Sequence, residues 1–202
     1  MPPDHADPLP APVSSSPANA RQSARLRLSE ARERFVTRGG IAVADALAGH
    51  LSEVLAQLDP ECLGVYWPLR SEFNAARPWP CGESGTALPL ALPFAQRNPP
   101  AMHYRQWDGL PPADLDECGI ATPRGAPVVP DVLLVPCLGY TDDGFRLGYG
   151  GGYFDRYLAA HPHVTAVGVA WSVGRLGAGD FTPEAHDQPL MLVVTEQGVV
   201  GG

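Results

Sequence analysis

The chain has 202 residues, of which 45% are hydrophobic, and this suffices for one domain with a sizeable core. Its net charge of -8 at pH 7 gives no overall positive field, so nonspecific nucleic-acid binding is not expected. All 14 basic residues are arginine. The absence of lysine from the sequence excludes a Schiff-base lysine, a pyridoxal phosphate aldimine and a Walker-type phosphate-loop lysine.

The cysteine and hydropathy patterns favour a cytoplasmic protein without a membrane span. The four cysteines are Cys62, Cys81, Cys118 and Cys137. They show no C-x-x-C spacing, so neither a structural zinc site nor a disulfide framework is expected. No uninterrupted apolar run reaches the roughly 18 residues of a membrane helix. We therefore expect a reduced protein that associates with no membrane. A monomer is also expected.

The first part of the chain divides into a tail and two helices. Residues 1–20 are rich in Pro, Ala and Ser and predict a disordered tail, and residues 21–202 predict a single domain. A helical pattern starts at Arg21, and a second spans roughly Val43–Leu58. The residues on one face of the first helix are Arg21, Arg25, Leu28 and Arg32. A basic face of this kind either contacts an anion or is simply solvated.

Short apolar runs separated by turns follow the helices. The candidate strands are Leu63–Trp67, Ala87–Leu92, Met102–Trp107, Val132–Val135, Thr165–Ala170 and Leu190–Thr195. The run Val132–Val135 lacks polar alternation, as expected for a strand covered on both faces. A further helix is predicted from about Gly152 to Ala160. The pattern predicts a layered α/β domain with a mostly parallel central sheet flanked by helices.

A glycine-rich segment follows the buried strand. After Pro136 come a polar turn, Arg146 and Asp155, and the glycines between them are Gly148, Gly150, Gly151 and Gly152. Glycines at a helix start let backbone N–H groups approach a phosphate, although a tight strand-to-helix turn explains one or two of them equally well. The dinucleotide spacing G-x-G-x-x-G is not met from Gly148 or from Gly150. The segment therefore predicts a phosphate-binding loop of neither common type.

The motif resembles the signature of the 5-formyltetrahydrofolate cyclo-ligase family. The matching residues are Pro136, Gly139, Tyr140, Arg146, Leu147, Gly148, Gly150, Gly152, Tyr153, Phe154 and Asp155. The segments Val65–Glu72 and Phe181–Glu196 also look like parts of the family. The resemblance covers about residues 21–196 and is weakest in the middle.

The resemblance implies a role for each matching residue. The implied ATP-binding residues are Arg21, Arg25, Arg146, Leu147, Gly148, Tyr149, Gly150, Gly151, Gly152 and Tyr153. The implied folate-binding residues are Trp67, Glu72, Tyr149, Gly150, Gly151, Gly152 and Tyr153. Arg146 and Tyr153 would be catalytic, and Asp155 and Asp187 would hold Mg²⁺. We expect replacement of Arg146 by alanine to lower turnover and to leave the fold intact.

The chain departs from the family pattern at three positions. Arg21 stands where relatives usually have lysine, and Gly151 stands where some relatives have another lysine. Because arginine and lysine differ in geometry, the first exchange preserves charge but alters the contacts available. Met191 replaces an aspartate that is common before the last strand.

The resemblance implies an ATP- and magnesium-dependent enzyme that converts 5-formyltetrahydrofolate into 5,10-methenyltetrahydrofolate, ADP and phosphate. Phosphorylation of the formyl oxygen would be followed by ring closure from N10. Two alternatives stay open. One is a sugar-phosphate isomerase or acyl-transferase relative on a similar sheet, and the other is a noncatalytic folate- or nucleotide-binding protein. The position of Cys137 directly after the apolar run favours a packed apolar residue over a nucleophile.

Overall fold

The computed structural model describes residues 17–79, 87–177 and 179–201. Its main elements, in chain order, are α1 (Pro17–Leu58), β1 (Leu63–Gly64), β2 (Leu90–Arg97), β3 (Pro100–Trp107), β4 (Asp114–Leu115), β5 (Ala121–Thr122), β6 (Pro127–Val128), β7 (Val132–Pro136), β8 (Gly139–Tyr140), β9 (Arg146–Leu147), α2 (Tyr153–Ala160), β10 (Thr165–Val169), η1 (Ser172–Gly174), β11 (Leu192–Thr195) and β12 (Gly198–Val200).

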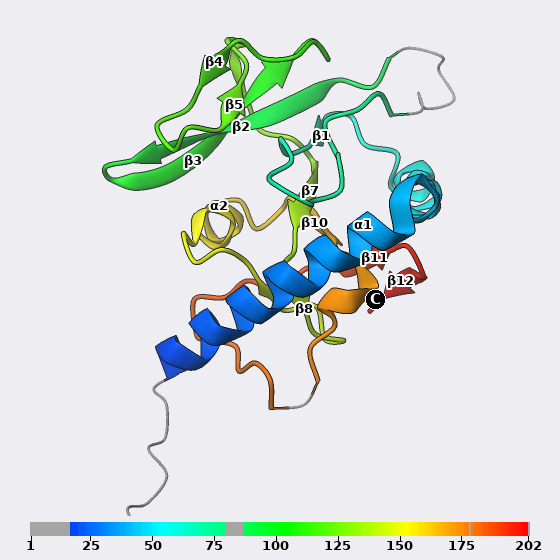
Figure 1. Ribbon diagram of the computed structural model, residues 1–202. Coiled ribbons are helices and arrows are strands. Elements are labelled where there is room, and N and C mark those ends of the chain that lie inside the picture. The colour runs from blue at the N-terminus through cyan, green and yellow to red at the C-terminus, as the bar shows by residue number, and fades with distance from the viewer. Residues whose placement is uncertain (1–16, 80–86, 178, 202) are drawn as a thin grey trace, which may run out of the picture.

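An eight-stranded sheet in the order β12-β11-β10-β7-β1-β2-β3-β6 forms the centre of the fold (Figure 1). The five strands from β11 to β2 pair in parallel, and β12, β3 and β6 pair antiparallel to their neighbours. The predicted fold class, a mostly parallel sheet with flanking helices, is confirmed. Parallel strands place their carboxyl ends on one edge, where α/β proteins commonly bind ligands.

The sheet is covered on both faces, as the unbroken apolar run of β7 predicts. Val132 and Leu134 lie in the cluster that contains Leu51 of α1, whereas Leu133 and Val135 lie in the cluster around α2. All four strand residues are buried. Because successive side chains of a strand point to opposite faces, this alternation fixes the three-layer arrangement of helix, sheet and helix.

The first helix is longer than the sequence pattern predicts and is broken near its middle. It begins at Pro17, four residues before the helix start that the sequence predicts, and residues 1–16 lie outside the described part. Gly40 leaves the helical conformation with φ 56° and ψ -143°. The break separates the basic first half from the second half, as the two predicted patterns require. Figure 1 shows the chain changing direction between them.

Part of α1 is apolar enough to satisfy a length and hydropathy criterion for a membrane span. Its best window reaches a mean hydropathy of 1.2, and 28% of that window is buried. Leu47 and Leu51, which have no exposed surface, pack against the sheet. Packing in the core explains why these positions of α1 are apolar. That the protein does not associate with a membrane stays a prediction.

The strand predictions differ from the structure mainly in their ends. The segment predicted as Leu63–Trp67 forms a strand only over its first two residues, after which the chain turns toward the site described below. The segment predicted as Ala87–Leu92 begins at Leu90 and extends to Arg97, where it makes a long hairpin with β3. Local apolarity locates such strands but does not reveal how far a partner extends them.

Candidate active site

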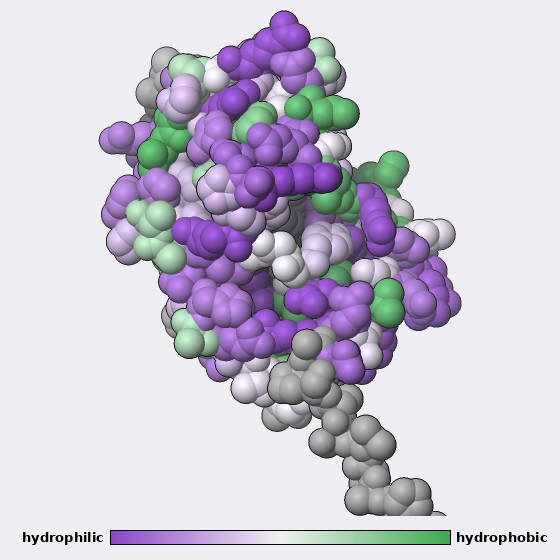
Figure 2. Space-filling view, turned by 90° about the vertical axis from the view of Figure 1, so that its left-hand side faces the viewer, coloured by the Kyte–Doolittle hydropathy of each residue, from purple (hydrophilic) through white to green (hydrophobic). Residues whose placement is uncertain are grey.

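A cavity of about 490 Å³ lies at the carboxyl ends of β1 and β7. Every residue to which the resemblance assigns a contact lines it, together with residues from the β2–β3 hairpin and from the segment before β11. Figure 2 views the molecule from the side of α2 and the start of α1, and shows a mainly hydrophilic face that is hollowed near its middle. The sequence-predicted residues are thus brought together, while their individual roles stay predictions.

The glycine loop between β9 and α2 approaches α1 closely. Gly150 has φ 94°, and Gly152, which precedes the first turn of α2, has φ 63°. A Cβ atom on Gly150 would lie 3.2 Å from the guanidinium carbon of Arg25. Arg25 Nε also donates a 2.9 Å hydrogen bond to the carbonyl oxygen of Gly148. Only glycine fits both this conformation and this close approach.

Two arginines of α1 reach the cavity from the first turns of the helix. Arg21 Nη2 donates to Asp187 Oδ2 at 2.7 Å and to the carbonyl oxygen of Thr182 at 2.9 Å. Burial, together with the neighbouring Arg21, lowers the pKa of Arg25, although its guanidinium stays charged at neutral pH. The two cations repel each other, so an anion between them would be stabilised.

Arg146 approaches the same cavity from β9 and is largely buried. Its Nη2 atom lies 3.0 Å from Asp155 Oδ2, and its side chain is 6% exposed. The other carboxylate oxygen of Asp155 accepts a 3.2 Å hydrogen bond from the backbone N–H of Gln188. The first turn of α2 and the segment before β11 are thereby tied to the arginine of the glycine-rich motif.

The carboxylates proposed as metal ligands both line the cavity, and arginines pair with both. Burial alone would raise the pKa of Asp187, but hydrogen bonds from Arg21 and from the backbone N–H of Glu184 hold that pKa below its ordinary value. Within residues 17–79, 87–177 and 179–201, no group of three or more His, Cys, Asp or Glu side chains is placed to hold a metal. Mg²⁺ commonly takes one or two carboxylates with phosphate oxygens and water. Asp155 and Asp187 therefore fit Mg²⁺ only in the company of a phosphate ligand.

The segment that follows β1 adds an aromatic ring and a buried carboxylate to the cavity wall. The Glu72 side chain is 4% exposed and accepts a 2.8 Å hydrogen bond from the backbone N–H of Leu69. Burial raises the pKa of Glu72. Trp67 lines the cavity and packs edge-on against Trp107 of β3. A flat ring system that offers N–H donors suits this wall chemically.

The sequence reasoning missed the contribution of the β2–β3 hairpin and the loop that follows it. The residues added from these segments are Pro93, Ala95, Met102, Asp116, Cys118 and Ile120. Cys118 Sγ lies 3.2 Å from the hydroxyl of Tyr153, and this hydrogen bond raises the pKa of Tyr153. These positions carry no local motif; the pairing of β2 with β1, and the hydrogen bond from the backbone N–H of Ala95 to Asp116, bring their segments to the site.

Cys137, directly after β7, behaves as a packed residue. It is 4% exposed, and burial raises its pKa to about 12. A thiol with that pKa holds almost no thiolate at neutral pH, so the geometry agrees with the packing interpretation rather than with a nucleophile.

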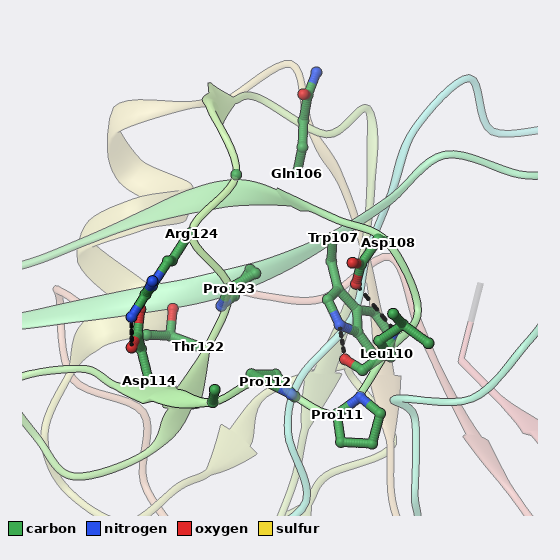
Figure 3. A pocket seen from close by; sticks show the side chains of 12 residues that line it. Gln106, Trp107, Asp108, Leu110, Pro111, Pro112, Asp114, Thr122, Pro123 and Arg124 are labelled. Atoms are coloured by element: carbon green, nitrogen blue, oxygen red, sulfur yellow. Dashed lines mark hydrogen bonds and ion pairs between the residues drawn. The ribbon is translucent and has the colours of Figure 1, made fainter.

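A second cavity of about 680 Å³ lies beyond the end of β3 (Figure 3). Trp107, Leu110 and three prolines form much of its wall, and Trp107 Nε1 donates to the carbonyl oxygen of Leu110 at 2.6 Å. Arg124 and Asp114 form an exposed ion pair on its other side. Trp107 of this cavity packs against Trp67, which lines the first cavity.

Comparison with known proteins agrees with this geometry. The sequence model of the 5-formyltetrahydrofolate cyclo-ligase family matches residues 90–196. A 5-formyltetrahydrofolate cyclo-ligase from Mycoplasma pneumoniae is 35% identical over 68 residues, which are 33% of this chain and 40% of that protein. The matched part thus spans well under half the length of that curated relative.

Two solved structures share the fold. A 5,10-methenyltetrahydrofolate synthetase from Mycoplasma pneumoniae superimposes with a TM-score of 0.67 at 18% identity, covering 87% of this chain and 98% of that one. The 5,10-methenyltetrahydrofolate synthetase of Aquifex aeolicus gives a TM-score of 0.64 at 21% identity, covering 93% of each chain. At these identities the likeness establishes the fold.

Proposed function

The chain belongs to the 5-formyltetrahydrofolate cyclo-ligase family, and from this premise we propose that it converts 5-formyltetrahydrofolate into 5,10-methenyltetrahydrofolate with consumption of ATP. One observation carries the proposal. A single cavity is lined both by Arg21, Arg25 and the glycine loop, which suit an anion, and by Trp67 and the buried Glu72, which suit a flat ring with N–H donors. Its volume of about 490 Å³ lies within the range of small-molecule sites, roughly 300–1,000 Å³.

The proposed reaction has two chemical steps. The formyl oxygen attacks the γ-phosphorus of ATP, a new oxygen–phosphorus bond forms, and ADP leaves. N10 then attacks the activated formyl carbon, the carbon–oxygen bond breaks, and inorganic phosphate leaves with the former formyl oxygen. The N10 proton is released, and the product is the cyclic methenyl cation. No covalent enzyme intermediate is needed, so the chain has mainly to position two ligands and neutralise charge.

Arg146 and the arginines of α1 fit the electrostatic part of this chemistry. Phosphoryl transfer spreads negative charge over the equatorial oxygens of the transferred group, and fixed cations stabilise that charge. Arg146 is buried beside Asp155 and lines the cavity, so its charge lies close to any bound phosphate. Arg25 reaches the glycine loop directly, which supports a phosphate contact shared by both. Tyr153 lies at the start of α2 and completes the cavity wall there.

Magnesium is part of the proposal because ATP-dependent phosphoryl transfer commonly uses it. Asp155 and Asp187 would hold the ion together with phosphate oxygens, and the ion would supply positive charge beside the transferred phosphoryl group. Both carboxylates would exchange an arginine contact for this role, and the released guanidinium groups of Arg146 and Arg21 would then be available to the phosphates. A cytoplasmic location and a monomeric state stay predictions.

The test is formation of the methenyl chromophore by the purified full-length protein. Supplied with 5-formyltetrahydrofolate, ATP and Mg²⁺, the protein should produce the absorbance of 5,10-methenyltetrahydrofolate, and omission of ATP should abolish it. Binding of both ligands without any product would support a noncatalytic binding protein instead. If the protein shows no binding of either ligand and no turnover, an unrelated activity on the same fold would be favoured.

A further inference from the structure

Arg32 is the most deeply buried arginine among the residues that the structure describes, with 2% exposed surface. It lies on α1 and is not among the residues that line the cavity, whereas Glu72 and Tyr149 are. Burial of a charged side chain is costly unless other groups compensate it. The partners of Arg32 therefore indicate what its position achieves.

Those partners come from two loops that are far apart in the sequence. Arg32 Nε donates to Ser71 Oγ at 3.1 Å, and Arg32 Nη2 donates to the hydroxyl oxygen of Tyr149 at 2.5 Å. Arg32 Nη1 lies 3.9 Å from Glu72 Oε1. Ser71 and Glu72 follow β1, while Tyr149 belongs to the glycine loop between β9 and α2. One side chain of α1 thus joins the loop proposed for the folate to the loop proposed for the nucleotide.

The hydrogen bonds have a defined direction. A guanidinium group only donates, so the hydroxyl oxygen of Tyr149 must accept from Arg32. The hydroxyl proton of Tyr149 is then free to be donated to the carboxylate of Glu72, and this hydrogen bond lowers the pKa of Glu72. Arg32 therefore stabilises the ionised form of Glu72 in two ways, by its own charge and by orienting Tyr149.

We infer that Arg32 is a positioning residue that holds Glu72 ionised and aligned as the acceptor for N–H donors of the bound folate. The inference rests on the proposed function, because it specifies how one wall of the same cavity recognises its ligand. Arg32 acts through Glu72 and Tyr149 and touches neither substrate.

The groups around Glu72 determine the direction in which loss of Arg32 would change the pKa of this carboxylate. The charged and titratable groups facing this carboxylate are Arg32 from α1, Tyr149 from the glycine loop, Tyr66 after β1 and Cys137 after β7. Burial raises the pKa of Tyr66 and of Cys137, so both are neutral near pH 7 and Arg32 is the charged group of the set. Loss of the Arg32 charge should therefore raise the pKa of Glu72 further above its ordinary value.

The first experiment measures the pKa of Glu72 and does not require turnover. Carboxyl ¹³C resonances of glutamate-labelled protein are titrated with pH, and the Glu72→Gln variant assigns the Glu72 signal. Arg32→Met should raise the pKa of Glu72 by about one unit or more. Arg32→Lys should leave this pKa nearer the wild-type value, because a positive charge is kept. An Arg32→Met protein in which Glu72 titrates as in the wild type would overturn the inference.

The second experiment measures kinetics as a function of pH. Arg32→Met should raise the folate KM about tenfold or more, with a smaller effect on the ATP KM, and should move the acid limb of kcat/KM for the folate to higher pH. Arg32→Lys should recover part of the loss. The matched control is Arg34→Met on the same helix, whose side chain is 63% exposed, and it should behave as the wild type. A uniform fall in kcat with an unmoved acid limb would mean that Arg32 is only structural.

Ser71→Ala keeps the test decisive if Arg32→Met does not fold. This variant removes one hydrogen bond to Arg32 and leaves its charge in place. A smaller rise of the folate KM in the same direction supports the inference, and an unchanged KM together with an unchanged Glu72 titration contradicts it. If the wild-type protein forms no product, the proposed function fails, and the Glu72 titration still decides whether Arg32 controls that carboxylate.

Discussion

Replacement of Arg146 by methionine separates the contribution of this residue to stability from its contribution to activity. The sequence pattern alone assigns Arg146 to phosphate binding and predicts that its loss leaves the fold intact. The structure adds an expected stability cost, because Arg146 is buried and lies 3.0 Å from Asp155, whose side chain is only 15% exposed. Arg146→Met would leave this carboxylate without its cation.

Breaking a buried ion pair by removing one partner costs about 3–5 kcal/mol, and the partial exposure of Asp155 favours the lower end, about 3 kcal/mol. For a chain of 202 residues, this lowers the melting temperature by about 6–12 °C. The double variant Arg146→Met/Asp155→Asn removes both charges, so its stability should return to within about 1 kcal/mol of the wild type. Its turnover should stay about 100-fold or more below the wild type, because the cation that serves the phosphates and one proposed Mg²⁺ ligand are both missing.

Urea unfolding followed by circular dichroism measures the stability of the wild type and both variants, and methenyl absorbance measures turnover. The reasoning predicts a double variant that is stable and inactive. It would be refuted by an Arg146→Met protein as stable as the wild type, or by a double variant that turns over at the wild-type rate.

Three further predictions concern single positions. Gly150→Ala should weaken ATP binding and cost about 1–3 kcal/mol of stability, because φ is 94° and the new methyl group would meet the guanidinium of Arg25. The control Gly49→Ala, in an open helical position, should stabilise the protein by about 0.5–1 kcal/mol. Isothermal titration measures ATP binding, and urea unfolding measures stability. Leu51→Ala should cost about 2–5 kcal/mol in urea unfolding, since Leu51 has no exposed surface, and a cost below 1 kcal/mol would contradict the packing described. Iodoacetamide at pH 8 should label Cys118 in the folded protein and spare Cys137, whose pKa is about 12, and mass spectrometry distinguishes the two.

Local sequence patterns predicted the parts of this fold that depend on local chemistry. The apolar run of β7 specified a strand buried on both faces, and the glycines before α2 specified a sharp entry into a helix. The resemblance added residues as distant as Glu72 and Asp187, and both line the same cavity as the glycine loop. These features could be predicted because each depends on residue types at fixed spacings.

Contacts that depend on tertiary pairing could not be predicted in the same way. The shared basic face placed Arg32 beside Arg21 and Arg25, but nothing in that spacing revealed that Arg32 is buried and joins two loops. The hairpin residues that line the cavity were missed because strand pairing, rather than a motif, brings them there. Asp155 was predicted as a metal ligand, and no local pattern indicated that Arg146 would pair with its carboxylate.

The central claim is that this cavity brings ATP and 5-formyltetrahydrofolate together for transfer of the γ-phosphoryl group to the formyl oxygen. The most direct measurement uses substrate labelled with ¹⁸O in the formyl group and analyses the inorganic phosphate by mass spectrometry. We predict one labelled oxygen in each phosphate released, with product formation strictly dependent on ATP. Methenyl product accompanied by unlabelled phosphate, or product formed without ATP, would contradict the account.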